Sequence, residues 1–129
     1  MSCISSYSNV AYDEALVTIE EALAVIEETG ERFLEAEVYR TKGELLLAKG
    51  ASNVVLAGQA FRTAIEVAHR QKAKSWELRA TTSLGRLLAK EGKRDEARAM
   101  LADIYNWFTE GFDTADLKDA KSLLDELSN

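Results

Sequence analysis

The sequence predicts an all-α fold of stacked helical hairpins, and three observations lead to it. The segment EAEVYRTKGELLLAKG at residues 35–50 has a similar counterpart, ELRATTSLGRLLAKEG, at residues 77–92, so the two are related by a constant offset of 42 in sequence number (77 − 35). Apolar residues recur at spacings of three and four, as along one face of a helix, and no stretch alternates as a strand would. The chain contains no proline. A period of this length is typical of helical hairpins that bury their apolar faces only against the neighbouring hairpin.

The first predicted helix spans Tyr12–Glu28. Residues 1–10 before it are small and polar, and we expect them to form a disordered leader to one repeat domain at residues 11–129. Ala15 matches Ala57 at the same offset (57 − 15 = 42), so this helix corresponds to the second helix of a hairpin. Its apolar face consists of Tyr12, Ala15, Leu16, Ile19, Ala22, Leu23 and Ile26.

Glycines and polar capping residues mark the ends of five further helices. The second helix runs from about Arg32 to Lys49 before Gly50, and the third runs from an N-cap at Ser52 or Asn53 to about Gln71. The fourth begins at an N-cap, Ser75, and ends at Gly92, the fifth spans Asp95–Thr109, and the sixth runs from a cap at Asp113 or Thr114 to about Leu127.

Gly43 and Gly85 occupy the same position in the two repeated segments, in the middle of a helix. A glycine there costs about 1 kcal/mol relative to alanine. Its recurrence at one repeat position predicts that neighbouring helices approach closely at these two points.

The small and apolar residues of the two repeats follow one pattern. In the first repeat they are Tyr39, Gly43, Leu46, Gly50, Ala57, Phe61 and Ala64, and in the second they are Thr81, Leu84, Gly85, Leu88, Gly92, Ala97, Leu101 and Ile104. This pattern resembles the tetratricopeptide repeat. The chain differs in its longer period of 40 to 42 (97 − 57 and 57 − 15), in lacking the terminal proline, and in having Lys42 in place of a leucine. The resemblance implies a right-handed solenoid of about six antiparallel helices, in which the first helix of each hairpin lines a concave face.

A narrower resemblance rests on three segments: ERFLEAEVYRTKGELLLAKG, AKSWELRATTSLGRLLAKEG and YNWFTEGFDTADLKDAKSLLDEL. They resemble the C-terminal tetratricopeptide-repeat region of large bacterial regulators. Those regulators join an adenylate cyclase-type (class III) domain, or a winged-helix DNA-binding domain, to a predicted signalling ATPase. The resemblance covers residues 12–127 and implies a sensor or scaffold tail in signalling. The catalytic parts of those regulators are missing from this chain, so their activities do not carry over.

The charge of the chain disfavours several classes of partner. With a net charge of −6 and a pI of about 4.9, it lacks the clustered basic residues that bind nucleic acid or anionic membranes. No apolar run approaches the roughly 18 residues needed to span a bilayer. The first ten residues, MSCISSYSNV, contain no secretory signal, and we expect a cytoplasmic protein.

The sequence indicates no catalytic chemistry, no metal and no cofactor. The nearest match to a phosphate-binding loop, at Gly92-Lys93, continues with Arg94 and has Leu87 where the first glycine should stand. His69 and Cys3 are the only histidine and cysteine, too few for a zinc site of about four such ligands. We therefore predict that the chain is not an enzyme.

Two sets of residues are candidates for partner binding. The concave-face set is Glu37, Arg40, Glu44, Arg79, Thr82, Ser83 and Arg86. Arg79 and Arg86 lie two helical turns apart, where they could hold a carboxylate or an acidic peptide. The alternative is ordinary surface charge, including a helical Arg40–Glu44 pair. Trp107 is a second candidate anchor, because tryptophan is enriched in binding hot spots. Its alternative is packing within the aromatic cluster of residues 105–112.

The predicted function is a non-catalytic module that binds protein or peptide, as a scaffold or regulatory tail in bacterial signalling. The alternative is a fragment or subunit that regulates a nucleotide cyclase or signalling ATPase on another chain, and a small-molecule sensor ranks third. The first helix lacks a partner helix before it, which leaves one side bare at Tyr12, Leu16, Ile19 and Leu23. We expect that side to form a homodimer, or to dock on another domain.

Overall fold

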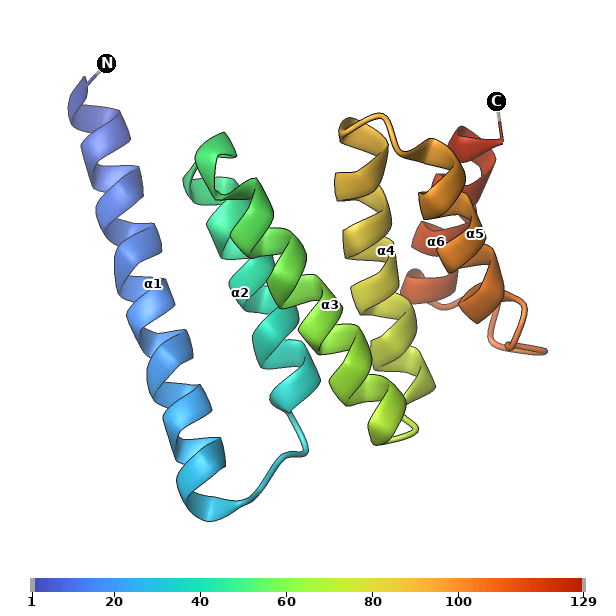
Figure 1. The fold of residues 1–129 in the computed structure, drawn as a ribbon, viewed down its shortest axis with the longest axis horizontal. Coiled ribbons are helices and arrows are strands. Elements are labelled where there is room, and N and C mark those ends of the chain that lie inside the picture. Colours follow the sequence, from blue (N-terminus) through green and yellow to red (C-terminus); the bar gives the residue numbers. More distant parts are fainter. Residues whose placement is uncertain (1, 129) are drawn as a thin grey trace.

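The computed structural model describes residues 2–128, with side chains from Val10 onward. This part of the chain contains six α-helices (Figure 1). They are α1 (Ser2–Thr29), α2 (Glu35–Lys49), α3 (Val54–Arg70), α4 (Lys74–Lys90), α5 (Arg94–Tyr105) and α6 (Ala115–Leu127), with a short 3-10 helix, η1 (Ala51–Asn53), before α3. No strand occurs between residues 2 and 128, so the predicted all-α class is confirmed.

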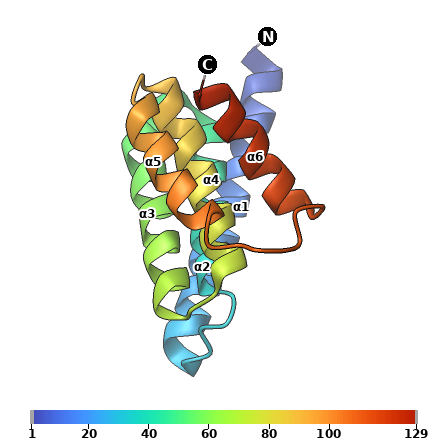
Figure 2. The same ribbon diagram turned by 90° about the vertical axis from the view of Figure 1, so that its right-hand side faces the viewer.

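The helices pack consecutively, each against the next along the chain, and α4 forms the centre. It contacts α2, α3, α5 and α6. Figure 2 shows α3 and α5 on one side of α4, with α1 and α6 on the other. The face of α2 and α4 that is turned away from α3 and α5 therefore lies between α1 and α6.

The hydrophobic core lies around α4. The largest fully buried side chains are Phe61 of α3, Leu78 and Leu84 of α4, and Leu101 of α5. Burying side chains of this size stabilises the fold by about 1.5–3 kcal/mol each. Because four helices surround α4, even its polar Thr81, Thr82 and Ser83 are only 4% exposed.

The close approach predicted at the two mid-helix glycines is confirmed, with different partners. A Cβ atom on Gly43 would lie 2.5 Å from Cε1 of Phe61, so the Phe61 ring packs directly on the backbone of α2. On Gly85 it would lie 3.3 Å from Cδ2 of Leu123 in α6. Leu101, which aligns with Phe61 in the repeat, is not the nearest neighbour of Gly85.

Several helix ends differ from the prediction. Helix α1 begins at Ser2 rather than Tyr12, so the backbone of residues 2–10, expected as a disordered leader, is helical. Helix α4 begins after Ala73, which places Ser75 inside the helix instead of at its cap. Helix α5 ends at Tyr105, because the backbone turns at residues 106 and 107. Thr114 precedes α6 as predicted.

Helix α1 also differs from α3, with which it aligns. Ala57 and Phe61 of α3 are fully buried, whereas Ala15 and Ile19 of α1 are only half-buried. The reason is that α3 packs between α2 and α4, while α2 is the only helix that α1 contacts within the described residues.

Replacing Gly43 by alanine tests the contact with Phe61. We expect Gly43→Ala to lower the free energy of unfolding by about 1–3 kcal/mol, because the ring must move to admit the methyl group. Gly58→Ala is the matched control. Its Cβ would lie at an ordinary distance of 3.6 Å from Cδ2 of Leu87. There the better helix propensity of alanine should raise the unfolding free energy by up to about 1 kcal/mol. Chemical denaturation measures both, and equal shifts would contradict tight packing at Gly43.

Candidate functional site

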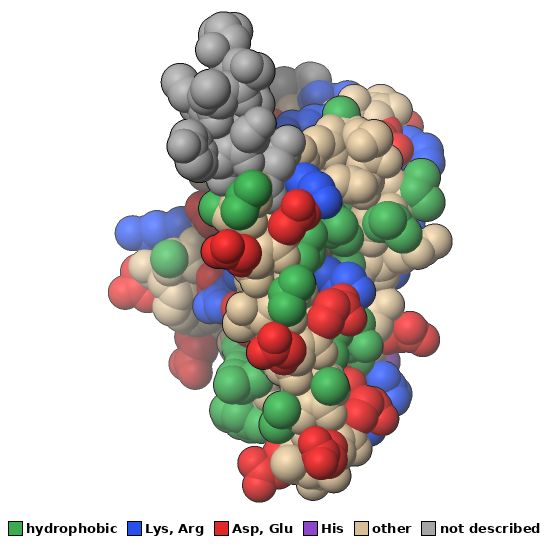
Figure 3. Space-filling model, turned by 90° about the vertical axis from the view of Figure 1, so that its left-hand side faces the viewer, with side chains coloured by type: hydrophobic (Ala, Val, Ile, Leu, Met, Phe, Trp, Pro, Cys, Tyr) green, Lys and Arg blue, Asp and Glu red, His purple; other side chains and the backbone are tan. Residues whose placement is uncertain are grey.

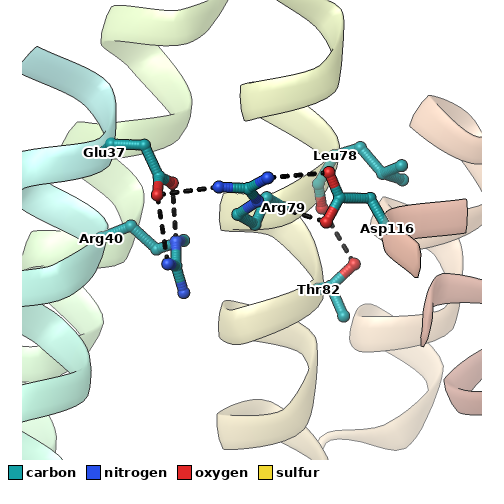
Figure 4. Close-up of polar contacts among 6 residues, drawn as sticks. All are labelled: Glu37, Arg40, Leu78, Arg79, Thr82 and Asp116. Atoms are coloured by element: carbon teal, nitrogen blue, oxygen red, sulfur yellow. Dashed lines mark hydrogen bonds and ion pairs between the residues drawn. The ribbon is translucent and has the colours of Figure 1, made fainter. Parts of the chain in front are cut away.

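A chain of ion pairs crosses the exposed face of α2, α4 and α6 (Figure 4). Arg40 donates hydrogen bonds to the Glu37 carboxylate at 2.8 and 3.2 Å, and Arg79 donates to the same carboxylate at 2.9 Å. Arg79 also donates to both carboxylate oxygens of Asp116, at 3.2 and 3.0 Å. A single guanidinium thus joins three helices.

The offset of 42 between the two similar segments accounts for half of this arrangement. Glu37 and Arg79 lie 42 residues apart, so each has the same position in its segment. Helices α2 and α4 are in contact, so an acid and a base at matching positions can meet. Asp116 lies 37 residues after Arg79, outside the repeat spacing, so no signal in the sequence connects the two.

The network stabilises the charged form of both central groups. Burial alone would raise the pKa of Glu37, but the hydrogen bonds and charges of Arg40 and Arg79 outweigh it and hold that pKa below its ordinary value. The pKa of Arg79 is raised, first by its hydrogen bonds to Asp116 and also by Glu37, although burial acts in the opposite direction.

These pairs change the interpretation of the arginines on α4. The guanidinium of Arg79 is already bound to two carboxylates of its own chain. Arg86 is more accessible, since its side chain is 49% exposed and lies 3.6 Å from Asp119 in a long contact. The expected Arg40–Glu44 pair does not form, because Arg40 binds Glu37 instead.

Two adjoining hollows open on this face. The smaller, of about 220 Å³, is lined by Arg40, Arg79, Thr82, Ser83, Arg86, Asp116 and Asp119. The larger, of about 590 Å³, has an apolar floor of Leu47, Ala48, Ala51, Val54 and Leu87, with Glu44, Ser83, Arg86, Lys90 and Glu91 around it. Ser83 and Arg86 line both hollows, which we together call the α2–α4 groove.

The groove contains most of the predicted concave-face set. Six of the seven residues line it, and Glu37 lies beside it, bound to Arg40 and Arg79. The hydroxyl of Thr82 is used within its own helix, where it donates to the Leu78 carbonyl at 2.9 Å. Asp116 and Asp119 of α6, together with the apolar floor, were missed from the sequence.

Trp107 does not line the groove: it lies in the turn after α5 and is 57% exposed. Its ring packs edge-on against Phe108 at 5.1 Å, and the Lys74 ammonium lies 5.5 Å from the ring centre. It borders a separate hollow of about 340 Å³ that His69, Glu77 and other residues also line. The structure therefore does not bring Trp107 together with the groove.

The four residues expected to leave one side of α1 bare are half-buried. Tyr12, Leu16, Ile19 and Leu23 each have intermediate exposure. Since α2 is the only helix against which the described part of α1 packs, it covers this face.

Among residues 10–128, whose side chains the structure describes, no group of three or more His, Cys, Asp or Glu could hold a metal ion. Every fully buried side-chain nitrogen or oxygen in the described part has a hydrogen-bond partner. No helix in it is long and apolar enough to cross a membrane.

Comparisons of the chain with protein-family models, with curated proteins and with solved structures find no match. The resemblance to the tetratricopeptide family and to the bacterial regulators therefore stays a prediction.

The lowered pKa of Glu37 predicts a pH-dependent contribution to stability. A carboxylate whose pKa falls on folding stabilises the protein above its ordinary pKa, here 4.5, and this stability is lost as the pH falls through the folded-state value. We expect Glu37→Gln to lower the unfolding free energy at pH 7 by about 1 kcal/mol, because the pairs are partly exposed.

The difference between wild type and Glu37→Gln should shrink towards zero as the pH falls below 4.5 and through the lower folded-state pKa of Glu37. Urea denaturation across this range measures it. Glu44→Gln is the control, because Glu44 is exposed on the same helix and has no ion pair among the described side chains. A difference that stays constant from pH 7 to pH 3 would contradict the network.

Proposed function

We propose that this chain is a non-catalytic helical-repeat module that binds a protein segment or peptide in the α2–α4 groove. The observation that carries the proposal is the continuity of a charged hollow and an apolar hollow along one face, joined at Ser83 and Arg86. A groove with an apolar floor and few charged groups at its edges suits an extended or helical segment that anchors one apolar side chain.

A tetratricopeptide-like arrangement is supported by three contacts. Gly43 lies under the aromatic ring of Phe61, as the small and aromatic positions of such a repeat require. Equivalent residues of the two repeats, Glu37 and Arg79, meet across neighbouring helices. Helices α2, α4 and α6 contact one another in sequence, as the first helices of successive hairpins would.

The chemistry of the groove defines the expected partner. Arg86 and Lys90 stand beside the apolar hollow and can bind a carboxylate, whereas Arg79 is already neutralised by its own chain. Leu47, Val54 and Leu87 offer an apolar surface to a leucine-sized side chain, whose burial contributes about 1.5–3 kcal/mol. Glu44 and Glu91 line the same hollow, so the groove favours one carboxylate placed to meet Arg86 or Lys90, and not a run of acidic residues. The expected partner is therefore a segment with an apolar anchor and a nearby Asp or Glu.

Selection from a random peptide library on the purified chain would test this function. We expect the enriched peptides to combine an Asp or Glu with a Leu, Ile, Met or Phe. Fluorescence polarisation should then show at least about tenfold weaker binding to Arg86→Glu, the equivalent of about 1.4 kcal/mol. Ala48→Trp, which fills the apolar hollow, should weaken binding without the charge change.

Arg98→Glu is the matched control, because Arg98 is similarly exposed but lies on α5. It should bind the selected peptides as the wild type does. Thermal melts of all three variants should stay near the wild-type value. Peptides that bind Arg86→Glu and Ala48→Trp as tightly as the wild type would place the binding site outside the groove.

A further inference from the structure

Helix α1 exposes a second apolar surface, on the side opposite its contact with α2. Val10, Val17 and Val25 are 53%, 57% and 54% exposed, and Ala24 is exposed beside them. We call these four residues the outer α1 face. Figure 3 shows this side of the molecule, where apolar side chains alternate with carboxylates along the helix. Val10, Val17 and Ala24 are spaced by seven, so they follow one line along the helix.

The acidic residues of α1 divide into two sets. Asp13, Glu20 and Glu27 form ion pairs with Lys49, Lys42 and Arg32, at 2.5, 2.8 and 3.0 Å. Glu14, Glu21 and Glu28, each one residue later, are exposed and form no ion pair with a described side chain. They lie beside the apolar line at the same spacing of seven. Helix α1 itself contains no Lys or Arg.

A shallow hollow lies along one edge of this face. It measures about 590 Å³ and is lined by Leu16, Val17 and Ala24, with Asp13, Glu20 and Glu21 at its rim. The small Ala24 and the β-branched Val17 leave room for a side chain of a partner helix. An apolar seam with carboxylates along its edge is how one helix of a coiled coil selects its partner.

The charges of α1 disfavour a second copy of the chain as the occupant of the outer α1 face. In a two-fold dimer the same face of both chains meets, so each copy would bring Glu14, Glu21 and Glu28 to the interface. No cation on α1 would offset them. Like charges placed opposite one another at an interface are strongly unfavourable. On the outer α1 face, a partner of opposite charge is therefore favoured over a second copy of the chain.

We propose that the outer α1 face docks a basic amphipathic helix of another protein. Its apolar residues pack against Val10, Val17 and Ala24, and its Lys or Arg residues, spaced by about one heptad, pair with Glu14, Glu21 and Glu28. This surface shares no lining residue with the α2–α4 groove.

A synthetic three-heptad peptide tests the proposal, with leucines at every third or fourth position and lysines beside them. A permuted peptide of identical composition, with its leucines spread around the helix, is the control probe. By fluorescence polarisation the first should bind the full chain at least about tenfold more tightly than the second. The affinity of the first peptide for the chain should fall as the salt concentration rises to about 0.5 M.

Two triple variants locate the site. The variant with Glu14→Lys, Glu21→Lys and Glu28→Lys should lose the tight binding. The variant with the isosteric Gln at the same three positions should bind more weakly than the wild type, with unchanged helix content. Glu66, Asp103 and Glu110, which are exposed on other parts of the chain, are replaced by Lys as the control with the same change in net charge. That control should retain about half or more of the discrimination between the two peptides.

Three results would overturn the proposal. One is equal binding of the two peptides to the wild type. Another is equal loss of binding in both Lys triple variants, which would mean that the peptide responds only to net charge. The third is a stable dimer in size exclusion with light scattering that Val17→Glu converts to a monomer, which would make a second copy the occupant of this face.

Discussion

The packing of α4 among four other helices is the constraint on which the rest of the structure depends. Little of the surface of α4 remains exposed, so Thr81 and Thr82 are buried. Their hydroxyls donate hydrogen bonds to the backbone carbonyls of Glu77 and Leu78. The strip of α4 that remains open is short, and Arg79 and Arg86 project from it above the buried Ser83. Helices α2 and α6 border the same strip, which is why the groove and the ion-pair network both lie there.

Arg79 and Arg86 show how burial and neighbouring carboxylates decide the role of a charged residue. Arg79 and Arg86 are two turns apart on one helix and look equivalent in the sequence. Arg79 faces carboxylates from both neighbouring helices, while Arg86 faces one at a longer distance. A guanidinium held by two carboxylates of its own chain fixes the spacing of three helices. A guanidinium with a single long contact, such as that of Arg86, can exchange its carboxylate partner for another.

The all-α class and the six helices could be predicted from the sequence, because the apolar spacing and the capping residues agree. The apolar spacing identified six helices, and the paired glycines identified where helices approach closely. The Glu37–Arg79 pair was accessible in principle, from its spacing of one repeat. Asp116 and Asp119 were not, because α6 follows an irregular loop whose length does not match the repeat. The end of α5 was missed because Trp107 and Phe108 continue the apolar pattern although the backbone turns before them.

The helices are not held equally firmly. Helix α1 contacts one helix among the described residues, and α4 contacts four. An element with few packing neighbours can open at a lower free energy than global unfolding requires. We therefore expect α1 to unfold as a separate cooperative unit. Its amide protons should exchange with solvent before those of α4. A ligand that binds only the ordered form of such a unit spends part of its binding free energy on completing the folding of α1. The degree of order in one helix would then report whether that ligand is present.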